Sequence, residues 1–303
     1  MISPLSGNQP VHISTIAGKK MDNPIWISSM TGGTELANTI NKRLAGICGR
    51  YNLGMGLGSC RQLLENDDYL DDFKVRQLMP NQPLFANLGI AQVEQLIEKK
   101  EGEKIKSLVK KLEADGLIVH VNPLQEWLQP EGDKIFVSPL VTIKQLLDQV
   151  DFPIIVKEVG QGFGKESLKE LLKLPLEAVD FAANGGTNFS KIELFRSDEI
   201  VQDVFEKISY LGHDAETMVN WTNQLLAQMS DVKAKNIIVS GGVKNFLDGY
   251  YFINKVKMPS IYGMASGFLK YALESVEALE KFTELQLDGL KMANALLKIK
   301  GDE

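Results

Sequence analysis

Residues able to bind anions, move protons or coordinate cations follow short apolar runs along the chain. The most informative segments are Gly58-Ser-Cys-Arg61, His120-Val-Asn-Pro-Leu-Gln-Glu126, Val156-Lys-Glu-Val-Gly160, Ser240-Gly-Gly-Val243 and Met264-Ala-Ser-Gly267. Glycine allows a ligand to approach the backbone closely, and free backbone N–H groups bind anions. The last two segments each precede a helix-like stretch, so we expect a phosphate group to bind there at a helix start. The alternative is that these glycines only form tight turns.

Three side chains in these segments could act on charge or protons. Lys157 ends an apolar run, where a cation could stabilise negative charge on a bound cofactor; the alternative is a surface lysine. His120 and Asn122 alternate and therefore share one face, so His120 is either a proton-transfer group or a satisfied core histidine. Arg61 could bind a phosphate through two nitrogens or form a surface salt bridge.

Glu126 is the candidate metal ligand. The sequence lacks the clustered Cys and His residues of a transition-metal site. One carboxylate suits Mg²⁺, which keeps several waters and also binds substrate phosphates. Glu126 is therefore compatible with a Mg²⁺ site.

The segment Gly160-Gln-Gly-Phe-Gly-Lys-Glu166 superficially resembles a nucleotide-binding loop. Val159 and Glu166 occupy positions where a P-loop needs Gly and Ser or Thr, and Lys165 replaces the last glycine of a dinucleotide fingerprint. We therefore predict neither type of nucleotide loop here.

Eight apolar runs predict the strands that position these residues. Nearly continuous Ile, Val and Leu indicate strands buried on both faces, which are parallel and need helical crossovers. The expected strands are 25–30, 53–58, 84–89, 116–122, 152–159, 178–184, 236–242 and 260–265, and the expected helices are 34–51, 94–114, 167–174, 214–229 and a stretch from 268 onward. This alternation predicts an α/β fold, a (β/α)8 TIM barrel, with a doubly wound open sheet as the alternative.

Length and composition place further bounds. The 303 residues are 44% hydrophobic and 24% charged, an ordinary globular composition that fits one barrel domain, 1–303. We expect a lead-in over 1–20 and an insertion over 185–235. The net charge of −6 argues against nucleic-acid and anionic-membrane partners. Two cysteines, no signal-peptide pattern and no long apolar run predict a cytoplasmic protein.

Taken together, these segments resemble the type II isopentenyl-diphosphate delta-isomerases, flavoenzymes with a TIM-barrel fold. The resemblance extends over almost the whole chain from about Gly18. The shared motifs are Ser29-Met-Thr-Gly-Gly33, Gly58-Ser-Cys-Arg61, Ala86-Asn-Leu-Gly89, His120-Val-Asn-Pro-Leu-Gln-Glu126, Val156-Lys-Glu-Val-Gly160, Gly185-Gly-Thr-Asn-Phe189, Ser240-Gly-Gly242 and Gly263-Met-Ala265.

The resemblance implies a bound FMN and a set of site residues. Gln125 would belong to the substrate site and Glu126 would bind Mg²⁺, with His120, Asn122 and Arg61 lining the substrate pocket. The implied FMN contacts are Met30, Thr31, Gly32, Ser59, Asn87, Lys157 and Thr187, with the phosphate at Gly241, Gly242, Ala265 and Ser266.

The implied reaction is the interconversion of isopentenyl and dimethylallyl diphosphate in isoprenoid biosynthesis, an allylic proton shift that uses reduced FMN and Mg²⁺. A nicotinamide nucleotide such as NADPH would be the reductant, and relatives commonly form tetramers or octamers. The family usually has a basic Arg-Lys pair near its N-terminus, whereas residues 1–13 contain neither Arg nor Lys. Phe189 and Ala182 stand where many relatives have Trp and Ser. The alternatives are another FMN-dependent barrel oxidoreductase and a flavin-binding homologue of impaired activity that lacks the diphosphate clamp.

Overall fold

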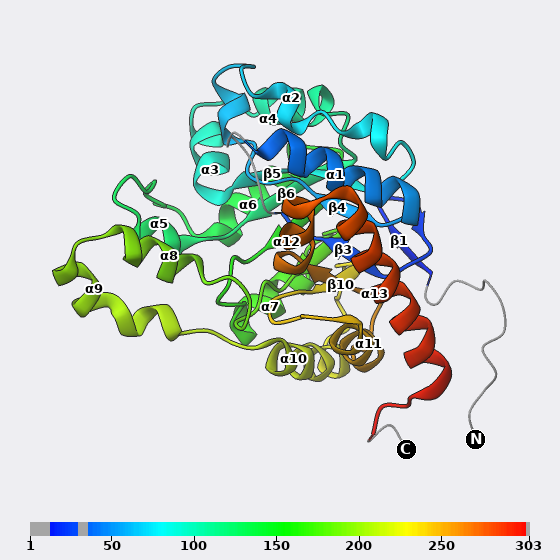
Figure 1. Cartoon of the computed structure of the whole chain (residues 1–303). Helices are drawn as coiled ribbons and strands as arrows, with labels where there is room; N and C mark the ends of the chain where they lie inside the picture. The colour runs from blue at the N-terminus through cyan, green and yellow to red at the C-terminus, as the bar shows by residue number, and fades with distance from the viewer. Residues whose placement is uncertain (1–12, 30–35, 301–303) are drawn as a thin grey trace.

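The computed structural model describes residues 13–29 and 36–300. Within these ranges, eight parallel strands close into a barrel in which neighbours in the chain are neighbours in the sheet (Figure 1). The strands are β3 (Ile25–Ile27), β4 (Gly54–Gly56), β5 (Leu84–Gly89), β6 (Gly116–His120), β7 (Ile154–Lys157), β8 (Ala178–Asp180), β9 (Asn236–Val239) and β10 (Ser260–Met264). The predicted (β/α)8 barrel is confirmed, and each strand lies within a predicted apolar run.

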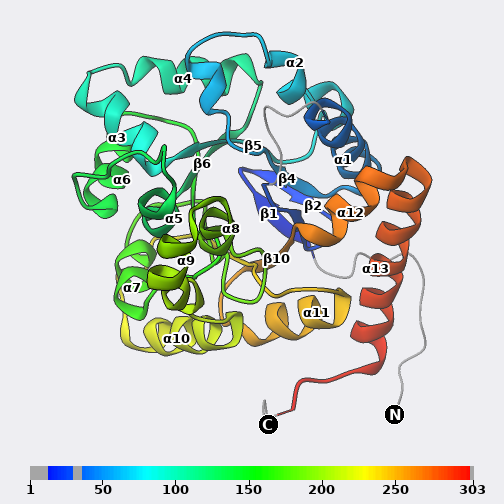
Figure 2. The same cartoon turned by 60° about the vertical axis from the view of Figure 1, so that its left-hand side comes forward.

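Helices surround this barrel, as Figure 2 shows from a second direction. Most connections therefore run as strand, helix, strand, the usual way to join parallel strands. The principal helices outside the 185–235 interval are α1 (Ala37–Tyr51), α2 (Leu70–Phe73), α3 (Ile90–Glu98), α4 (Glu103–Lys111), α5 (Pro123–Leu128), α6 (Pro139–Leu147), α7 (Lys165–Leu172), α11 (Phe246–Lys255), α12 (Ser266–Glu274) and α13 (Val276–Leu296).

The prediction of one helix over 94–114 is wrong, because α3 and α4 are separate helices. Lys100 has a left-handed backbone (φ 57°), which an α-helix does not accommodate. Gly102 precedes α4 and packs closely on Gln149, since a Cβ there would lie 2.6 Å from the Gln149 Oε1. The chain must turn between the two helices to keep both apolar faces against the barrel.

The interval after β8 holds several helical elements, in agreement with the expected insertion. In Figure 1, α8 and α9 extend away from the barrel, and α10 returns to it. Asn188, Asp198 and Asp214 cap the three helices through side-chain oxygens that accept backbone N–H groups. The elements are α8 (Phe189–Arg196), α9 (Glu199–Phe205), the 3₁₀ helix η3 (Glu206–Tyr210) and α10 (Ala215–Gln228).

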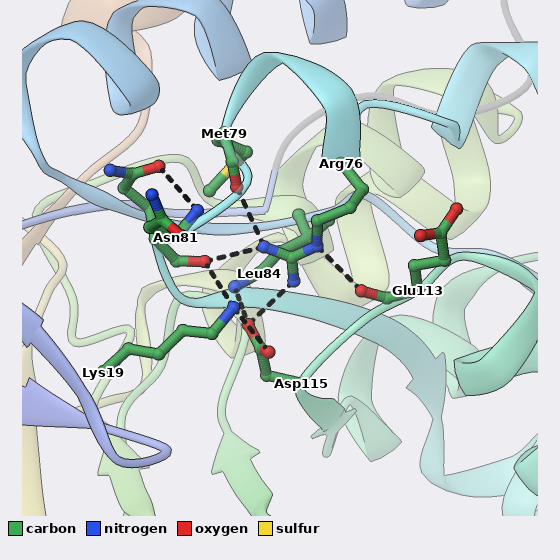
Figure 3. Close-up of polar contacts among 8 residues, drawn as sticks. Lys19, Arg76, Met79, Asn81, Leu84, Glu113 and Asp115 are labelled. Atoms are coloured by element: carbon green, nitrogen blue, oxygen red, sulfur yellow. Dashed lines mark hydrogen bonds and ion pairs between the residues drawn. The ribbon is translucent and has the colours of Figure 1, made fainter.

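A hairpin of β1 (Ser14–Ile16) and β2 (Lys19–Met21) lies at the amino-terminal end of the barrel, where a simple lead-in was expected. Lys19 forms an ion pair with Asp115 at 2.7 Å (Figure 3). Arg76 also pairs with Asp115 at 2.8 Å and donates to the carbonyl oxygens of Met79, Gln82 and Glu113. These contacts tie the hairpin to the loops beneath the strands.

Large side chains fill the barrel interior. Trp26 and Phe85 are fully buried and pack edge to face at 5.8 Å between ring centroids. The same interior cluster contains Ile118, Ile155 and Ile238. The barrel is therefore a packed core rather than a pore, and ligands can enter only around its rim. None of the helices in the described ranges is both long and apolar enough to cross a membrane.

Candidate functional site

A cavity opens at the carboxyl-terminal ends of β3, β7, β8, β9 and β10. Its lining contains six of the residues predicted to contact a flavin or its phosphate. They are Lys157, Thr187, Gly241, Gly242, Ala265 and Ser266. Because the strands are parallel, segments more than a hundred residues apart in sequence meet at this one rim.

The turn after β9 has a geometry that suits an anion. Gly241 has φ 87°, and a Cβ there would lie 2.0 Å from the carbonyl oxygen of Ala183, so a larger residue cannot occupy this position. Gly242 continues the turn. Ser266 is the first residue of α12, the helix that follows the neighbouring strand β10. A helix start and a glycine turn therefore face one cavity, which is a favourable arrangement for a phosphate group.

Two serine hydroxyls lie at the cavity without a partner in the described ranges. Ser28 and Ser29 follow β3, and both Oγ atoms are buried and lack a hydrogen bond there. Buried polar groups normally have partners, so two unsatisfied hydroxyls at a cavity indicate a polar ligand. Gly263 keeps the space open, since a Cβ there would lie 2.7 Å from Ser28 Oγ. The residues present thus fit a flavin nucleotide.

Lys157 supplies the positive charge of this cavity. It ends β7, is 8% exposed, and donates one hydrogen bond from Nζ to the Glu158 carbonyl oxygen at 2.7 Å. An ammonium group carries three hydrogens, so Nζ keeps donors for a ligand. The surface-lysine alternative is therefore wrong.

His120 and Asn87 form a directly bonded pair beside the cavity. The Asn87 side-chain nitrogen donates to the Leu57 carbonyl oxygen at 2.9 Å, which leaves Asn87 Oδ1 as the acceptor facing His120 Nδ1 at 2.8 Å. The imidazole proton therefore lies on Nδ1 and Nε2 is the free acceptor. Gly89 makes room for Nε2, since a Cβ at residue 89 would lie 2.9 Å from it.

The electrostatic surroundings keep His120 neutral. Burial, with a further contribution from the positive charge of Lys157, lowers the pKa of His120 to about 3. Lys157 is its direct register partner on β7. At neutral pH, His120 is thus a hydrogen-bonding group with a fixed tautomer rather than a cation.

Asn122, Gln125 and Glu126 form a polar cluster at the start of α5. The Asn122 amide nitrogen donates to Glu126 Oε1 at 2.9 Å and to Gln125 Oε1 at 3.3 Å. Gln125 in turn donates to Glu193 Oε1 at 3.2 Å. The Asn122 Oδ1 atom is buried and has no partner in the described part of the chain.

This cluster can hold a divalent cation only with help from a ligand. The described residues contain no group of three or more His, Cys, Asp or Glu side chains suited to a metal. The Glu126 carboxylate and the unpartnered Asn122 oxygen are two hard oxygen donors, and Mg²⁺ takes its remaining ligands from water and phosphate. The residues present therefore fit Mg²⁺ as a bridge to a phosphorylated substrate.

Arg61 contacts the same region through Asp133, a residue that no sequence motif pointed to. Arg61 forms an ion pair with Asp133 at 2.9 Å, while the Asp133 backbone N–H donates to Glu126 Oε2 at 2.7 Å. Gln92 and Gln95 also donate to the Asp133 carboxylate. Arg61 is half exposed, so it pairs with Asp133 and still faces solvent.

Some predicted positions fall outside these two groups. Ser59 is exposed in the loop after β4 and does not line the cavity. Asn87 lies with His120 rather than on the cavity wall. Met30, Thr31 and Gly32 lie outside the described residues.

The missed residues carry weak sequence signals. Ser28 directly follows the apolar residues Ile25–Ile27, and its position near the end of an expected parallel strand is the only signal for it in the sequence. Asp133 and Glu193 lie in a loop and a helix without any distinguishing spacing, and only tertiary contacts bring them to Glu126 and Gln125.

The glycine-rich segment after β7 has its own internal anion. Glu158 Oε2 accepts the backbone N–H groups of Gly160, Gln161 and Gly162 at 2.7, 2.6 and 2.7 Å. Those are the donors that a bound phosphate would use in a nucleotide loop. The segment therefore resembles such a loop in its row of backbone N–H groups. These groups bind the Glu158 carboxylate and not an external anion.

Known proteins resemble this chain in sequence and in fold. The chain is 37% identical over 284 residues to the isopentenyl-diphosphate delta-isomerase of Rickettsia felis (strain ATCC VR-1525 / URRWXCal2), which covers 92% of this chain and 78% of the relative. No protein-family model matches the chain.

Solved structures share the fold at low sequence identity. A flavocytochrome b2 variant with benzoylformate has a TM-score of 0.68 at 16% identity, over 99% of this chain and 71% of that one. A mandelate oxidase variant with a monooxide FMN adduct has a TM-score of 0.61 at 9% identity, over 98% of this chain and 81% of that one. At such identities the likeness concerns the barrel alone.

Proposed function

Because the chain belongs to the isopentenyl-diphosphate delta-isomerase family, we propose that it interconverts isopentenyl and dimethylallyl diphosphate by an allylic proton shift that uses reduced FMN and Mg²⁺. The observation that carries this proposal is the pairing of His120 on β6 with Lys157 on β7. This pair joins the cavity suited to a flavin to the amide and carboxylate cluster suited to a diphosphate.

The cavity residues have binding roles. Lys157, Thr187, Ser28 and Ser29 would contact the flavin, while the Gly241 turn and the start of α12 would hold its phosphate. When bound and reduced, FMN would supply an electron-rich ring that stabilises positive charge and exchanges the proton. Met30, Thr31, Gly32, Ser59 and Asn87 stay predictions as flavin contacts.

The polar cluster has orienting roles. Glu126, with the Asn122 oxygen, would hold Mg²⁺, and Arg61 would bind the diphosphate as a second cation. These groups bind a part of the substrate that does not react, and that binding energy can position the double bond. Neutral His120 offers Nε2 as an acceptor without adding a charge that would repel a cation-like centre.

The apolar surroundings protect the reaction. Protonation of an unactivated alkene creates a centre that water would trap, so the site must exclude water. Val159, Phe189 and Leu269 line the cavity beside its polar residues. They would shield the alkene while Gln125, held by Asn122 and Glu193, borders the substrate.

An assay with the whole chain tests the proposal. The protein should bind FMN, and after anaerobic reduction with Mg²⁺ present it should convert isopentenyl diphosphate, whereas oxidised enzyme should be inactive. Substrate-dependent flavin reduction without isomerisation would indicate an oxidoreductase. Flavin binding without turnover of either isomer would contradict the proposed activity.

We further propose NADPH as the reductant and the cytoplasm as the location. The low cysteine content supports a reducing compartment. Stopped-flow reduction of the bound FMN by NADPH, compared with NADH, tests the reductant.

A further inference from the structure

Asp180 is a fully buried carboxylate close to the proposed flavin cavity. It ends β8 with no exposed surface, and its Oδ1 accepts a hydrogen bond from the Ser240 hydroxyl. Its other oxygen, Oδ2, has no hydrogen-bond partner in the described residues. An unpaired buried carboxylate is costly, so a nearby positive charge is expected.

Lys157 provides that charge from the neighbouring strand. Lys157 and Asp180 are register partners on β7 and β8, so their side chains point to the same side of the sheet. Lys157 lines the cavity, which shows that this side faces the site. Burial raises the pKa of Asp180, and the positive charge of Lys157 together with the Ser240 hydrogen bond opposes this increase.

The Lys157 ammonium and the Asp180 carboxylate lie on neighbouring strands but form no direct ion pair. No acidic oxygen lies within 4.0 Å of Lys157 Nζ among the described residues, and the bond that Nζ donates goes to the Glu158 carbonyl oxygen. Lys157 therefore keeps donors for a ligand while Asp180 remains beside it. A negative charge in that position weakens the field that Lys157 applies to a bound ring.

We propose that Asp180 is a positioning residue that balances the charge of Lys157 and so sets the relative affinity of the site for reduced and oxidised FMN. This inference rests on the proposed function. Reduced FMN becomes anionic more easily beside an uncompensated cation, so the buried carboxylate limits how strongly the site favours the reduced form.

A purely structural role is the competing explanation. Ser240 Oγ also accepts a hydrogen bond from the Ala182 backbone N–H at 2.9 Å. In this explanation, the hydrogen bond that Asp180 accepts from Ser240 serves only to hold the turn after β8. That role predicts a loss of stability when Asp180 is changed, with no change in flavin energetics.

The test is Asp180→Asn in the FMN-loaded protein, with Kd measured separately for oxidised and reduced FMN. The ratio of the two affinities should shift about tenfold toward the reduced form, which equals a rise of about 30 mV in the two-electron potential. Glu177→Gln is the matched control, because Glu177 is similarly buried but binds Ala17 and Lys235 at the opposite end of the barrel. Its ratio should equal that of the wild type. An unchanged or lowered ratio in Asp180→Asn would overturn the proposal.

A second measurement needs neither flavin nor an Asp180 variant. In Lys157→Met the carboxyl loses its counter-charge, so infrared spectra with isotope-labelled aspartate should show a protonated carboxyl at neutral pH that the wild type lacks. Absence of this band in the folded variant would show that the two groups are not coupled and would overturn the inference. Failure of the wild type to bind FMN would instead contradict the proposed function.

Discussion

At the scale of single residues, the site depends on side chains whose hydrogen bonds fix their chemical state. Asn87 assigns the proton of His120 to Nδ1, and burial together with the positive charge of Lys157 disfavours a second proton. The Asn122 amide orients Glu126, and the Asp133 backbone orients it from the other side. These contacts hold the side chains in place before any ligand binds, which reduces the entropy cost of ordering them on binding.

The pKa of His120 leads to a prediction about pH. His120 is neutral in the folded protein down to about pH 3, while it titrates near 6.5 when unfolded. Because the pKa of His120 is lower in the folded than in the unfolded state, only the unfolded state binds the extra proton between pH 6.5 and pH 3. The free energy of unfolding is therefore unaffected above pH 6.5 and decreases as pH falls toward 3, by up to about 1.4 kcal/mol per pH unit.

The measurement is NMR of the imidazole resonance that disappears in His120→Gln. We expect its chemical shift to stay constant from pH 8 to pH 4.5. A titration midpoint near 6.5 would show that His120 is charged in acid and would contradict the neutral assignment.

Glu126 gives a second prediction. In Glu126→Gln the carboxylate charge is lost while the hydrogen bonds of the cluster can largely persist. We expect the Mg²⁺ concentration for half-maximal isomerase activity to rise at least about tenfold. This rise corresponds to the loss of about 1.4 kcal/mol or more of binding free energy, which is typical of an interaction with a charged group. Kd for FMN should stay within about twofold, since Glu126 does not line the cavity. Glu131→Gln is the control, because Glu131 is an exposed carboxylate in the segment that follows α5. Equal Mg²⁺ requirements in the two variants would argue against Glu126 as the ligand.

At the scale of the elements, the segments that follow β7 and β8 are stabilised by their own side chains, which accept hydrogen bonds from nearby backbone N–H groups. The Glu158 carboxylate collects three N–H groups of the glycine-rich segment after β7, and Asn188, Asp198 and Asp214 cap the helices of the insertion. Burial raises the pKa of Glu158, and the three N–H groups act in the opposite direction. The segment is therefore ordered by its own carboxylate rather than by a ligand.

We predict that Glu158→Gln lowers the free energy of unfolding by about 1.5–3 kcal/mol, the usual contribution of hydrogen bonds to a charged group. Urea denaturation measures it. Glu166→Gln, an exposed carboxylate at the start of α7, should change stability by no more than about 0.5 kcal/mol. If both variants are equally stable, the Glu158 carboxylate does not hold this segment.

At the scale of the whole molecule, apolar side chains on the insertion suggest assembly. Phe195 on α8 and Ile200 and Val204 on α9 are 69%, 76% and 69% exposed. In Figure 1, α8 and α9 lie to one side of the barrel, and in Figure 2, where that side comes forward, they lie in front of it. Large apolar side chains exposed on neighbouring helices are a feature that interfaces between subunits often bury. We propose that the chain forms a homo-oligomer, a tetramer or octamer, through this face.

Light scattering coupled to size exclusion tests this prediction. Ile200→Asp should lower the assembled mass, because a charge would be buried at the interface. Leu285→Asp on α13 is the control, since Leu285 is 61% exposed but lies on another helix. A wild-type chain that stays monomeric at micromolar concentration would contradict the proposal.

We also propose that the chain is a single domain, which a single cooperative unfolding transition would support.

Part of this protein was predictable from local pattern. The runs that became β5, β6 and β7 are apolar on both faces, a pattern that favours buried parallel strands. Once that is known, the residues at their carboxyl ends must share one rim, which is why His120 and Lys157 were expected near a site. The α3–α4 break was missed because apolar residues at helical spacing lie on both sides of Lys99–Gly102, although this segment has none itself and contains Gly102, a poor helix former.

The sequence by itself therefore determined the buried parallel strands and which segments lie at their carboxyl ends, since these follow from hydrophobic pattern and the geometry of parallel sheets, while closure into a barrel rather than an open sheet is seen in the structure. Only the tertiary structure decided the partners: Asp133 between Arg61 and Glu126, Asp180 beside Lys157, and Glu158 within its own loop. Hydrophobic burial acts on every residue of a run and leaves a period in the sequence. A hydrogen bond or charge contact joins two particular atoms distant in the chain, and it leaves no period to detect.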